Sequence, residues 1–163
     1  MRGKVVILTF LYTSCHDTCP LVTRKLHQTA ELLGKDIDKV ELIAVSVDPS
    51  RDSVEKAFDY SNTHGMTEIW NFLVGSENEL RPVWEYYWAG IVGEHTHIDD
   101  AYRGSGDGNE TTIYGENKIS LEGHIISHGT PVILIDTNGR RRVLFSGSTL
   151  NPLDLVHDIR LLL

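Results

Sequence analysis

The chain has 163 residues, with 23 acidic and 15 basic side chains, a formal net charge of −8 and two cysteines. A typical domain has about 100–200 residues, so the length predicts a single domain over residues 1–163. A domain of this size can fold without disulfides or a structural metal, and two cysteines exclude a metal site built from cysteine alone within one chain. The net acidity argues against nucleic acid as a partner.

The first half of the chain alternates apolar runs with helical patterns. Residues 5–11 are apolar and rich in β-branched side chains, which is typical of a buried strand, and seven residues cannot span a membrane. A helix is predicted to begin at Pro20, which is favoured at a first helical position, and to end at Gly34. The elements expected next are a strand at 40–47, a helix at 52–63, a strand at 70–74 and a helix at 77–88 interrupted or restarted at Pro82.

The second half contains a long insertion and then a regular ending. Residues 89–127 exceed the usual loop length, and Thr111–Tyr114 could pair with Lys118–Leu121 as a small hairpin. The elements expected afterwards are a strand at 131–135, a turn at Asn138-Gly139, a strand at 142–145 and a helix from residue 151 or 152. This order predicts an α/β fold with a central mixed sheet flanked by helices, in which the insertion precedes a C-terminal β-hairpin and helix.

Cys15 and Cys19 lie on the polar turn between the first strand and the first helix. At the start of a helix, unpaired N–H groups and the helix dipole favour a thiolate on Cys19. Two sulfurs four residues apart can bind one cation or close a disulfide, and soft thiolates prefer Cu(I), Zn(II) or iron–sulfur clusters. A two-sulfur site requires one or two further ligands, most naturally histidine. The alternative is that both cysteines are buried and have no function, as is common for cysteine. Their position on a polar turn, and not on an apolar face, argues against this alternative.

Four segments of the chain resemble the Sco/SenC family, whose members are thioredoxin-fold copper chaperones for the assembly of cytochrome c oxidase. Residues 3–20 are similar to the family's strand and its Thr-x-Cys-Pro-Asp-x-Cys-Pro turn. Residues 46–52 resemble its Ser-Val-Asp-Pro-x-Arg-Asp segment, and residues 70–76 its Trp-x-x-Leu-x-Gly-Ser/Thr segment. His128 precedes Asp136 by eight residues, a spacing similar to that between the family's histidine and its Asp-x-x-Gly turn. The resemblance implies a thioredoxin-like fold.

The resemblance also implies a metal site made of Cys15, Cys19 and His128. This site would bind copper, as Cu(I) or Cu(II), with zinc as a substitute, and the two cysteines would form a redox pair that holds the metal only when reduced. Asp48, at the end of the second strand, would orient a ligand, although an Asp-Pro turn that simply ends the strand is an equal alternative. Asp17, between the cysteines, is assigned the same supporting position.

Three further residues bear on this site. His16 follows the first cysteine where the family usually has proline, and we favour an exposed turn residue over a ligand there. His124, four residues before His128, is a lower-ranked ligand candidate. Pro131 stands near the position of the cis-proline that faces the cysteines in redox-active thioredoxins, and this departure from the family pattern favours thiol–disulfide chemistry.

Two functions therefore remain open. The first is a copper-binding assembly factor whose partner is an oxidase subunit with a copper site or another copper-transfer protein. The second is an enzyme, a thiol–disulfide oxidoreductase or thiol peroxidase that uses Cys15 and Cys19. Two observations favour the copper-binding function. Dedicated oxidoreductases prefer two residues between their cysteines, whereas this chain has three, and only the copper site requires His128. By resemblance the protein acts on the extracytoplasmic face of a membrane, in the periplasm, at the cell surface or in the mitochondrial intermembrane space. We expect any membrane anchor to precede residue 1.

Overall fold

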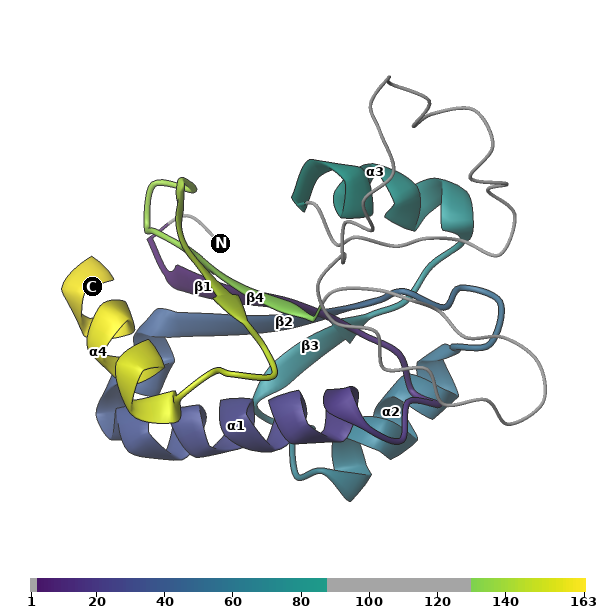
Figure 1. The fold of residues 1–163 in the computed structure, drawn as a ribbon, viewed down its shortest axis with the longest axis horizontal. Coiled ribbons are helices and arrows are strands. Elements are labelled where there is room, and N and C mark those ends of the chain that lie inside the picture. The colour runs from purple at the N-terminus through teal and green to yellow at the C-terminus, as the bar shows by residue number, and fades with distance from the viewer. Residues whose placement is uncertain (1–2, 88–129) are drawn as a thin grey trace, which may run out of the picture.

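The computed structural model describes residues 3–87 and 130–163, which form a five-stranded mixed sheet in the order β3-β2-β1-β4-β5 (Figure 1). The central strand β1 (Val5–Leu11) is buried at every position, as its unbroken apolar run predicts. It pairs in parallel with β2 (Val40–Ser46) and antiparallel with β4 (Pro131–Ile135). β3 (Trp70–Leu73) pairs in parallel with β2, and β5 (Arg141–Ser146) pairs antiparallel with β4. The predicted mixed sheet is confirmed.

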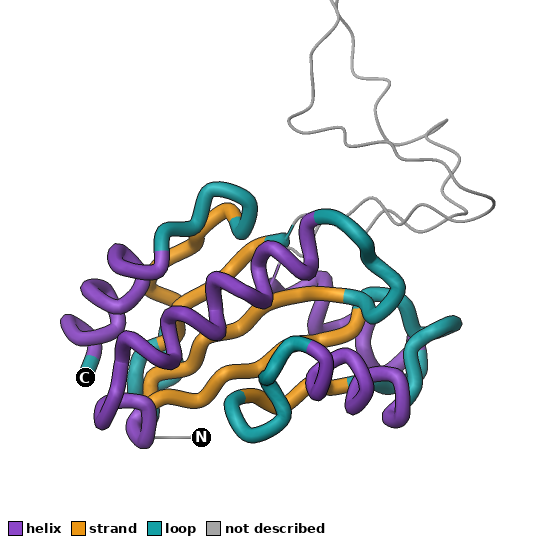
Figure 2. The backbone as a smooth tube through the Cα atoms, turned by 90° about the horizontal axis from the view of Figure 1, so that it is seen from below, coloured by secondary structure: helices purple, strands orange, loops and turns teal. Residues whose placement is uncertain are grey.

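Helices cover both faces of this sheet. α1 (Thr18–Leu33) and α4 (Pro152–Leu162) pack side by side on one face, and α2 (Val54–Thr63) lies on the same side (Figures 1 and 2). α3 (Glu77–Tyr87) covers the opposite face. The layers therefore enclose two apolar cores, one on each side of the sheet.

The side chains of β1 supply both cores because successive residues of a strand point to opposite faces. Val5 and Ile7 belong to the core under α1 and α4, which also contains both cysteines. Phe10 belongs to the other core, which also contains Leu80 and Trp84 of α3. The cysteine pair is therefore attached directly to the main core of the protein.

The starts of two helices differ from the sequence prediction. α1 begins at Thr18, so Pro20 occupies its third position, still within the first turn, where N–H groups have no intrahelical acceptor. α2 begins at Val54 because Ser53 caps it by accepting a hydrogen bond from the Lys56 N–H. Pro82 lies inside α3 without ending it. A short 3-10 helix, η1 (Gly34–Lys39), follows α1 and was not predicted.

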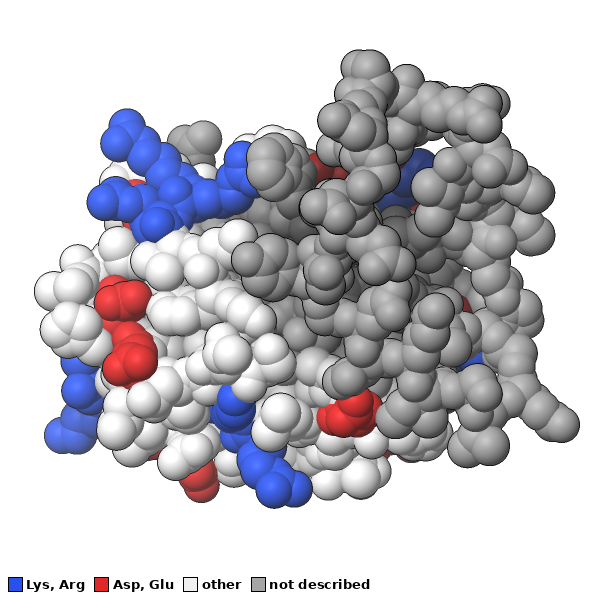
Figure 3. Space-filling view, viewed as in Figure 1, with Lys and Arg blue, Asp and Glu red and all other residues white. Residues whose placement is uncertain are grey.

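The predicted hairpin between β4 and β5 is present. Gly139 adopts a φ of +84°, which glycine tolerates without strain, and the Asp136 carboxylate accepts hydrogen bonds from the N–H groups of Asn138 and Arg140. Basic side chains gather over this hairpin (Figure 3), where Arg142 pairs with Asp136 and the Arg141 guanidinium lies 4.9 Å from the Tyr86 ring centre. Arg141 thus connects β5 to α3.

The predicted insertion at 89–127, with its hairpin at Thr111–Tyr114 and Lys118–Leu121, lies outside the described residues. Across residues 3–87 and 130–163, no helix is both long enough and apolar enough to span a bilayer.

Candidate functional site

The cysteine turn follows directly from the C-terminal end of β1 and leads into α1. The Cys19 N–H donates a hydrogen bond to the Cys15 Sγ over 3.4 Å, and the Cys15 N–H donates to the Tyr12 carbonyl over 3.3 Å. Both cysteines are free thiols. Cys19 is completely buried, whereas 9% of Cys15 is exposed. Cys15 is therefore the more accessible of two sulfurs that lie close together.

The two sulfurs share a proton unequally. A hydrogen bond from the Cys19 side chain lowers the pKa of Cys15 to about 5, and the backbone N–H groups of Asp17 and Cys19 act in the same direction against the effect of burial. The same side-chain hydrogen bond, followed by burial, raises the pKa of Cys19 above its ordinary value. At neutral pH Cys15 is a thiolate and Cys19 is the thiol that donates to it.

Two tyrosines border the pair. The Tyr12 side chain forms a hydrogen bond with the Cys15 sulfur and helps to lower its pKa. Burial, together with the charge of Cys15, raises the pKa of Tyr12, so its phenol remains a hydrogen-bond donor at neutral pH. On the α1 side, the Tyr60 hydroxyl lies 2.9 Å from the Thr23 hydroxyl, and burial raises the pKa of Tyr60 as well.

A surface hollow of about 380 Å³ lies beside Cys15. His16 is exposed and lines this hollow, in agreement with its expected place on the turn. The complete lining consists of Thr13, Cys15, His16, Pro20, Lys56, Tyr60, Thr63 and His64. Burial lowers the pKa of His64, so this imidazole is neutral at pH 7. The Cys15 side chain therefore borders an open hollow on the surface.

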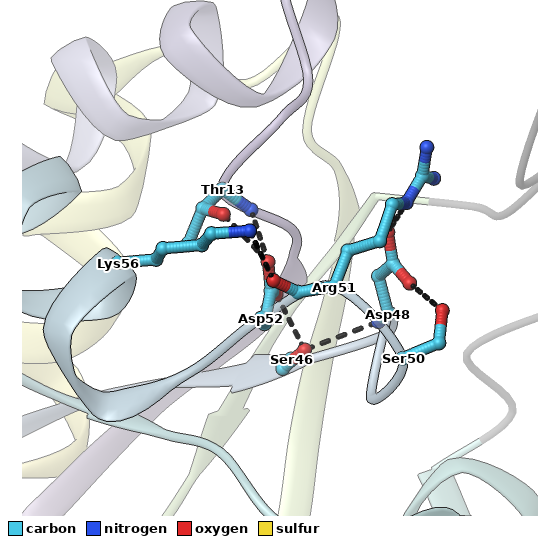
Figure 4. Close-up of polar contacts among 7 residues, drawn as sticks. All are labelled: Thr13, Ser46, Asp48, Ser50, Arg51, Asp52 and Lys56. Atoms are coloured by element: carbon cyan, nitrogen blue, oxygen red, sulfur yellow. Dashed lines mark hydrogen bonds and ion pairs between the residues drawn. The ribbon is translucent and has the colours of Figure 1, made fainter.

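Asp48 follows β2 and is 1% exposed, so its charge requires partners (Figure 4). Its carboxylate accepts hydrogen bonds from the Ser50 hydroxyl, over 2.8 Å, and from the Arg51 guanidinium. These contacts stabilise the turn between β2 and α2. They are contacts that an Asp-Pro turn at the end of a strand makes, which is one of the two roles considered for Asp48.

Asp52 also contacts the cysteine turn, although no role was predicted for it. Its Oδ1 accepts hydrogen bonds from the Thr13 N–H and the Thr13 hydroxyl, over 3.1 and 2.6 Å. Its Oδ2 accepts one from the Ser46 hydroxyl over 2.6 Å (Figure 4). The sequence signal that could have identified Asp52 is the segment 46–52, which carries part of the family resemblance and contains both Ser46 and Asp52.

The remaining predicted residues are distributed as follows. Asp17 immediately precedes α1, and its backbone N–H contributes to the low pKa of Cys15. Pro131 begins β4, and its carbonyl accepts a hydrogen bond from the Thr9 hydroxyl over 3.0 Å. The described part of the chain has no cis peptide bond, so the Thr130–Pro131 bond is trans, unlike the cis-proline with which the sequence position was compared. His124 and His128 lie outside the described residues.

The chemistry of the pair suits a soft metal ion or a disulfide. Two adjacent sulfurs, one already a thiolate, provide the donors that Cu(I) and Zn(II) prefer, and loss of the second proton completes a two-thiolate set. Within residues 3–87 and 130–163 no group of three histidine, cysteine or acidic side chains could hold a metal. In the described part of the chain, the two cysteines therefore have no third metal-binding side chain grouped with them.

This fold, a mixed sheet with a cysteine pair where β1 leads into α1, places the chain among thioredoxin-like α/β proteins. The chain matches the SCO1/SenC family model over residues 1–163, and it belongs to the SCO1/SenC family.

Relatives and solved structures agree with this assignment. A SCO2-like protein of Rickettsia prowazekii is 25% identical over 140 residues, which cover 86% of this chain and 57% of the relative. The chain thus spans less than two thirds of that relative's length. Copper-bound ScoI of Bradyrhizobium japonicum is 25% identical, with a TM-score of 0.72 over 99% of this chain and 87% of that one. The fold also matches BsSco, described as a Sco-family cytochrome c oxidase assembly protein with a disulfide switch, at 20% identity and a TM-score of 0.68 over 98% and 82% of the two chains.

Proposed function

We propose that this protein binds copper through its cysteine pair and takes part in the assembly of the copper site of cytochrome c oxidase. Copper is the cargo in this proposal and is handed on to another protein. The observation that carries the proposal is the hydrogen bond from the Cys19 N–H to the Cys15 Sγ, which holds two free sulfurs together at the start of a helix. The copper-bound Bradyrhizobium ScoI and the oxidase-assembly role of BsSco support the choice of metal and process.

The ligands in this proposal are the thiolates of Cys15 and Cys19 and the imidazole of His128. Two sulfurs and one nitrogen form a chemically suitable set for Cu(I), and Zn(II) would bind the same donors as a substitute. The third ligand in this proposal comes from residues 88–129, which lie outside the described residues, and it is chosen by resemblance to the family's histidine. His128 is our candidate for it.

The same cysteines make copper binding dependent on redox state. Oxidation of Cys15 and Cys19 to a disulfide releases two electrons and two protons to a disulfide of the partner, which becomes a dithiol. A disulfide has no thiolates to offer, so only the reduced protein binds Cu(I). The proposed partner is an oxidase subunit with a copper site or another copper-transfer protein, on the extracytoplasmic face of a membrane.

A second candidate is a thiol–disulfide oxidoreductase. The low pKa of Cys15 and the hollow beside it favour this function, because a thiolate within reach of a partner can attack a disulfide bond. In this case the thiol of Cys19 would attack the mixed disulfide and release the reduced product.

The test is an anaerobic titration of the reduced protein with Cu(I) in competition with a chromogenic Cu(I) chelator. We expect one Cu(I) per chain and a severe loss of affinity in both Cys15→Ser and Cys19→Ser. Catalytic reduction of a disulfide substrate by a protein that binds no copper would instead establish the oxidoreductase function.

A further inference from the structure

The carboxylate of Asp52 joins three parts of the fold that are distant in the sequence. Asp52 lies just before α2, its Oδ1 binds Thr13 in the cysteine turn, and its Oδ2 binds Ser46 at the end of β2 (Figure 4). Two of these three contacts, those between oxygens, are 2.6 Å long. Short hydrogen bonds to an ionised carboxylate are among the stronger ones in proteins.

Thr13 is held at both its backbone and its side chain. Its N–H and its hydroxyl donate to the same Asp52 oxygen, so neither the position nor the orientation of this residue is free to change. Thr13 lies two residues before Cys15, on the segment that carries the Cys15 sulfur towards the Cys19 N–H. Movement at Thr13 would therefore change the separation of the two sulfurs.

Asp52 is itself oriented by its surroundings. The Ser46 hydroxyl that donates to it also accepts a hydrogen bond from the Asp48 N–H, over 3.1 Å. The Asp52 N–H donates to the Asp48 carbonyl over 2.9 Å, and the Lys56 ammonium binds the Arg51 carbonyl over 2.8 Å. The turn between β2 and α2 thus gives the Asp52 carboxylate a single orientation, facing the cysteine turn.

We propose that Asp52 is a positioning residue for the cysteine pair: by anchoring Thr13 to the end of β2, it sets the distance between the Cys15 and Cys19 sulfurs. The two sulfurs must be held at a fixed spacing to share one metal ion or to form an intramolecular disulfide efficiently. Asp52 contacts neither the sulfurs nor a bound metal in this role. The effect of Asp52 on copper binding rests on the proposed function, whereas its effect on disulfide formation does not depend on that function.

The experiment compares Asp52→Ala, Asp52→Asn and the matched control Asp136→Ala. The Asp136 carboxylate also accepts three hydrogen bonds, from Asn138, Arg140 and Arg142, but in the β4–β5 turn. Asparagine retains an oxygen for Thr13 and presents its amide to Ser46, whose hydroxyl can accept it. Each variant is measured for Cu(I) affinity, for the disulfide-to-dithiol ratio in a fixed glutathione buffer, and for thermal unfolding.

We expect Asp52→Ala to weaken Cu(I) binding by about 10-fold, as is common when residues that orient ligands are removed, and to lower the fraction of disulfide in the same buffer. Asp52→Asn should restore most of both properties. Asp136→Ala should lower the unfolding temperature without changing either. The proposal is overturned if folded Asp52→Ala matches the wild type in disulfide fraction, or if Asp136→Ala changes that fraction equally.

If Asp52→Ala does not fold, Thr13→Val replaces it, since this change removes only the hydroxyl contact. A smaller loss in the same direction supports the proposal, and an unchanged disulfide fraction contradicts it. A wild-type protein that binds no Cu(I) would contradict the proposed function, while the disulfide ratio would still test the role of Asp52.

Discussion

The Cys19 N–H donates a hydrogen bond to the Cys15 Sγ at the first turn of α1. This contact places the Cys15 sulfur over the N-terminus of a helix, where the dipole and the free N–H groups stabilise negative charge. Because Cys19 is completely buried and Cys15 is not, the two residues differ in role. Cys15 is the thiolate and the more accessible of the two sulfurs, and Cys19 is its buried neighbour.

The first prediction concerns the pH dependence of Cys15 reactivity. Its pKa is lowered to about 5, so the thiolate is present at neutral pH and is lost as the pH falls through that value. Alkylation of the reduced, metal-free protein by iodoacetamide should therefore follow a single titration with its midpoint near pH 5. A midpoint near the ordinary thiol value of about 8.5 would contradict the hydrogen-bonded pair.

Two variants rank the causes of this low pKa. Cys19→Ala removes the largest contribution, the side-chain hydrogen bond, and should move the alkylation midpoint furthest towards the ordinary value. Tyr12→Phe removes a smaller contribution and should move it less in the same direction. Equal midpoints for Cys19→Ala and the wild type would show that the helix terminus alone accounts for the shift.

The second prediction concerns the close approach of Gly147 to α1. A Cβ at Gly147 would press against the Thr130 carbonyl and lie 2.6 Å from Val22 Cγ2. Since the carbonyl belongs to the backbone, it cannot move aside easily. Gly147→Ala should therefore lower the free energy of unfolding by about 1–3 kcal/mol, measured by urea denaturation.

Gly75→Ala is the matched control for this change. A Cβ there would lie 3.3 Å from Glu79 Oε2, the far end of an exposed side chain, which has to shift by only a few tenths of an ångström and can keep its hydrogen bonds to Ser76. The free energy of unfolding should change by less than about 0.5 kcal/mol. Similar losses for the two alanine variants would mean that backbone crowding at Gly147 is not the cause.

The third prediction separates the two roles considered for Asp48. Its carboxylate binds Ser50 and Arg51, so Asp48→Asn should cost about 1 kcal/mol of stability through the weakened turn. Copper affinity should remain close to that of the wild type, because these contacts serve the turn and not the sulfurs. A loss of copper affinity at unchanged stability would instead assign Asp48 to the orientation of a ligand.

Much of the fold could be predicted because its signals are local. The apolar run at 5–11 marks a strand buried on both faces, and Asn138-Gly139 marks a tight hairpin. The β2–α2 turn was harder, since an acidic residue before a helix is an ordinary cap. Here Ser53 caps the helix, and Asp52 binds Thr13, 39 residues earlier in the chain. No local pattern encodes a contact of that separation.

For the candidate site, too, the local features could be predicted and the features that depend on tertiary contacts could not. The cysteine spacing predicted a pair of sulfurs that could act together, and the structure brings them within hydrogen-bonding distance. The prediction of a thiolate on Cys19 was wrong: the pKa of Cys15 is lowered and that of Cys19 is raised. Which sulfur keeps the proton depends on burial and on the direction of the Tyr12 and Cys19 side chains, which the spacing does not encode. The assignment of His128 as the third ligand stays a prediction from the family resemblance.

The most direct test of the proposed copper site is the anaerobic Cu(I) affinity of His128→Ala, measured beside that of His157→Ala. His157 is an exposed histidine on α4 and serves as the matched control. Removing a ligand should cost at least the ~10-fold that loss of an orienting residue typically costs, whereas His157→Ala should bind Cu(I) like the wild type. If His128→Ala binds Cu(I) as tightly as the wild type, the two-thiolate-plus-histidine site is wrong.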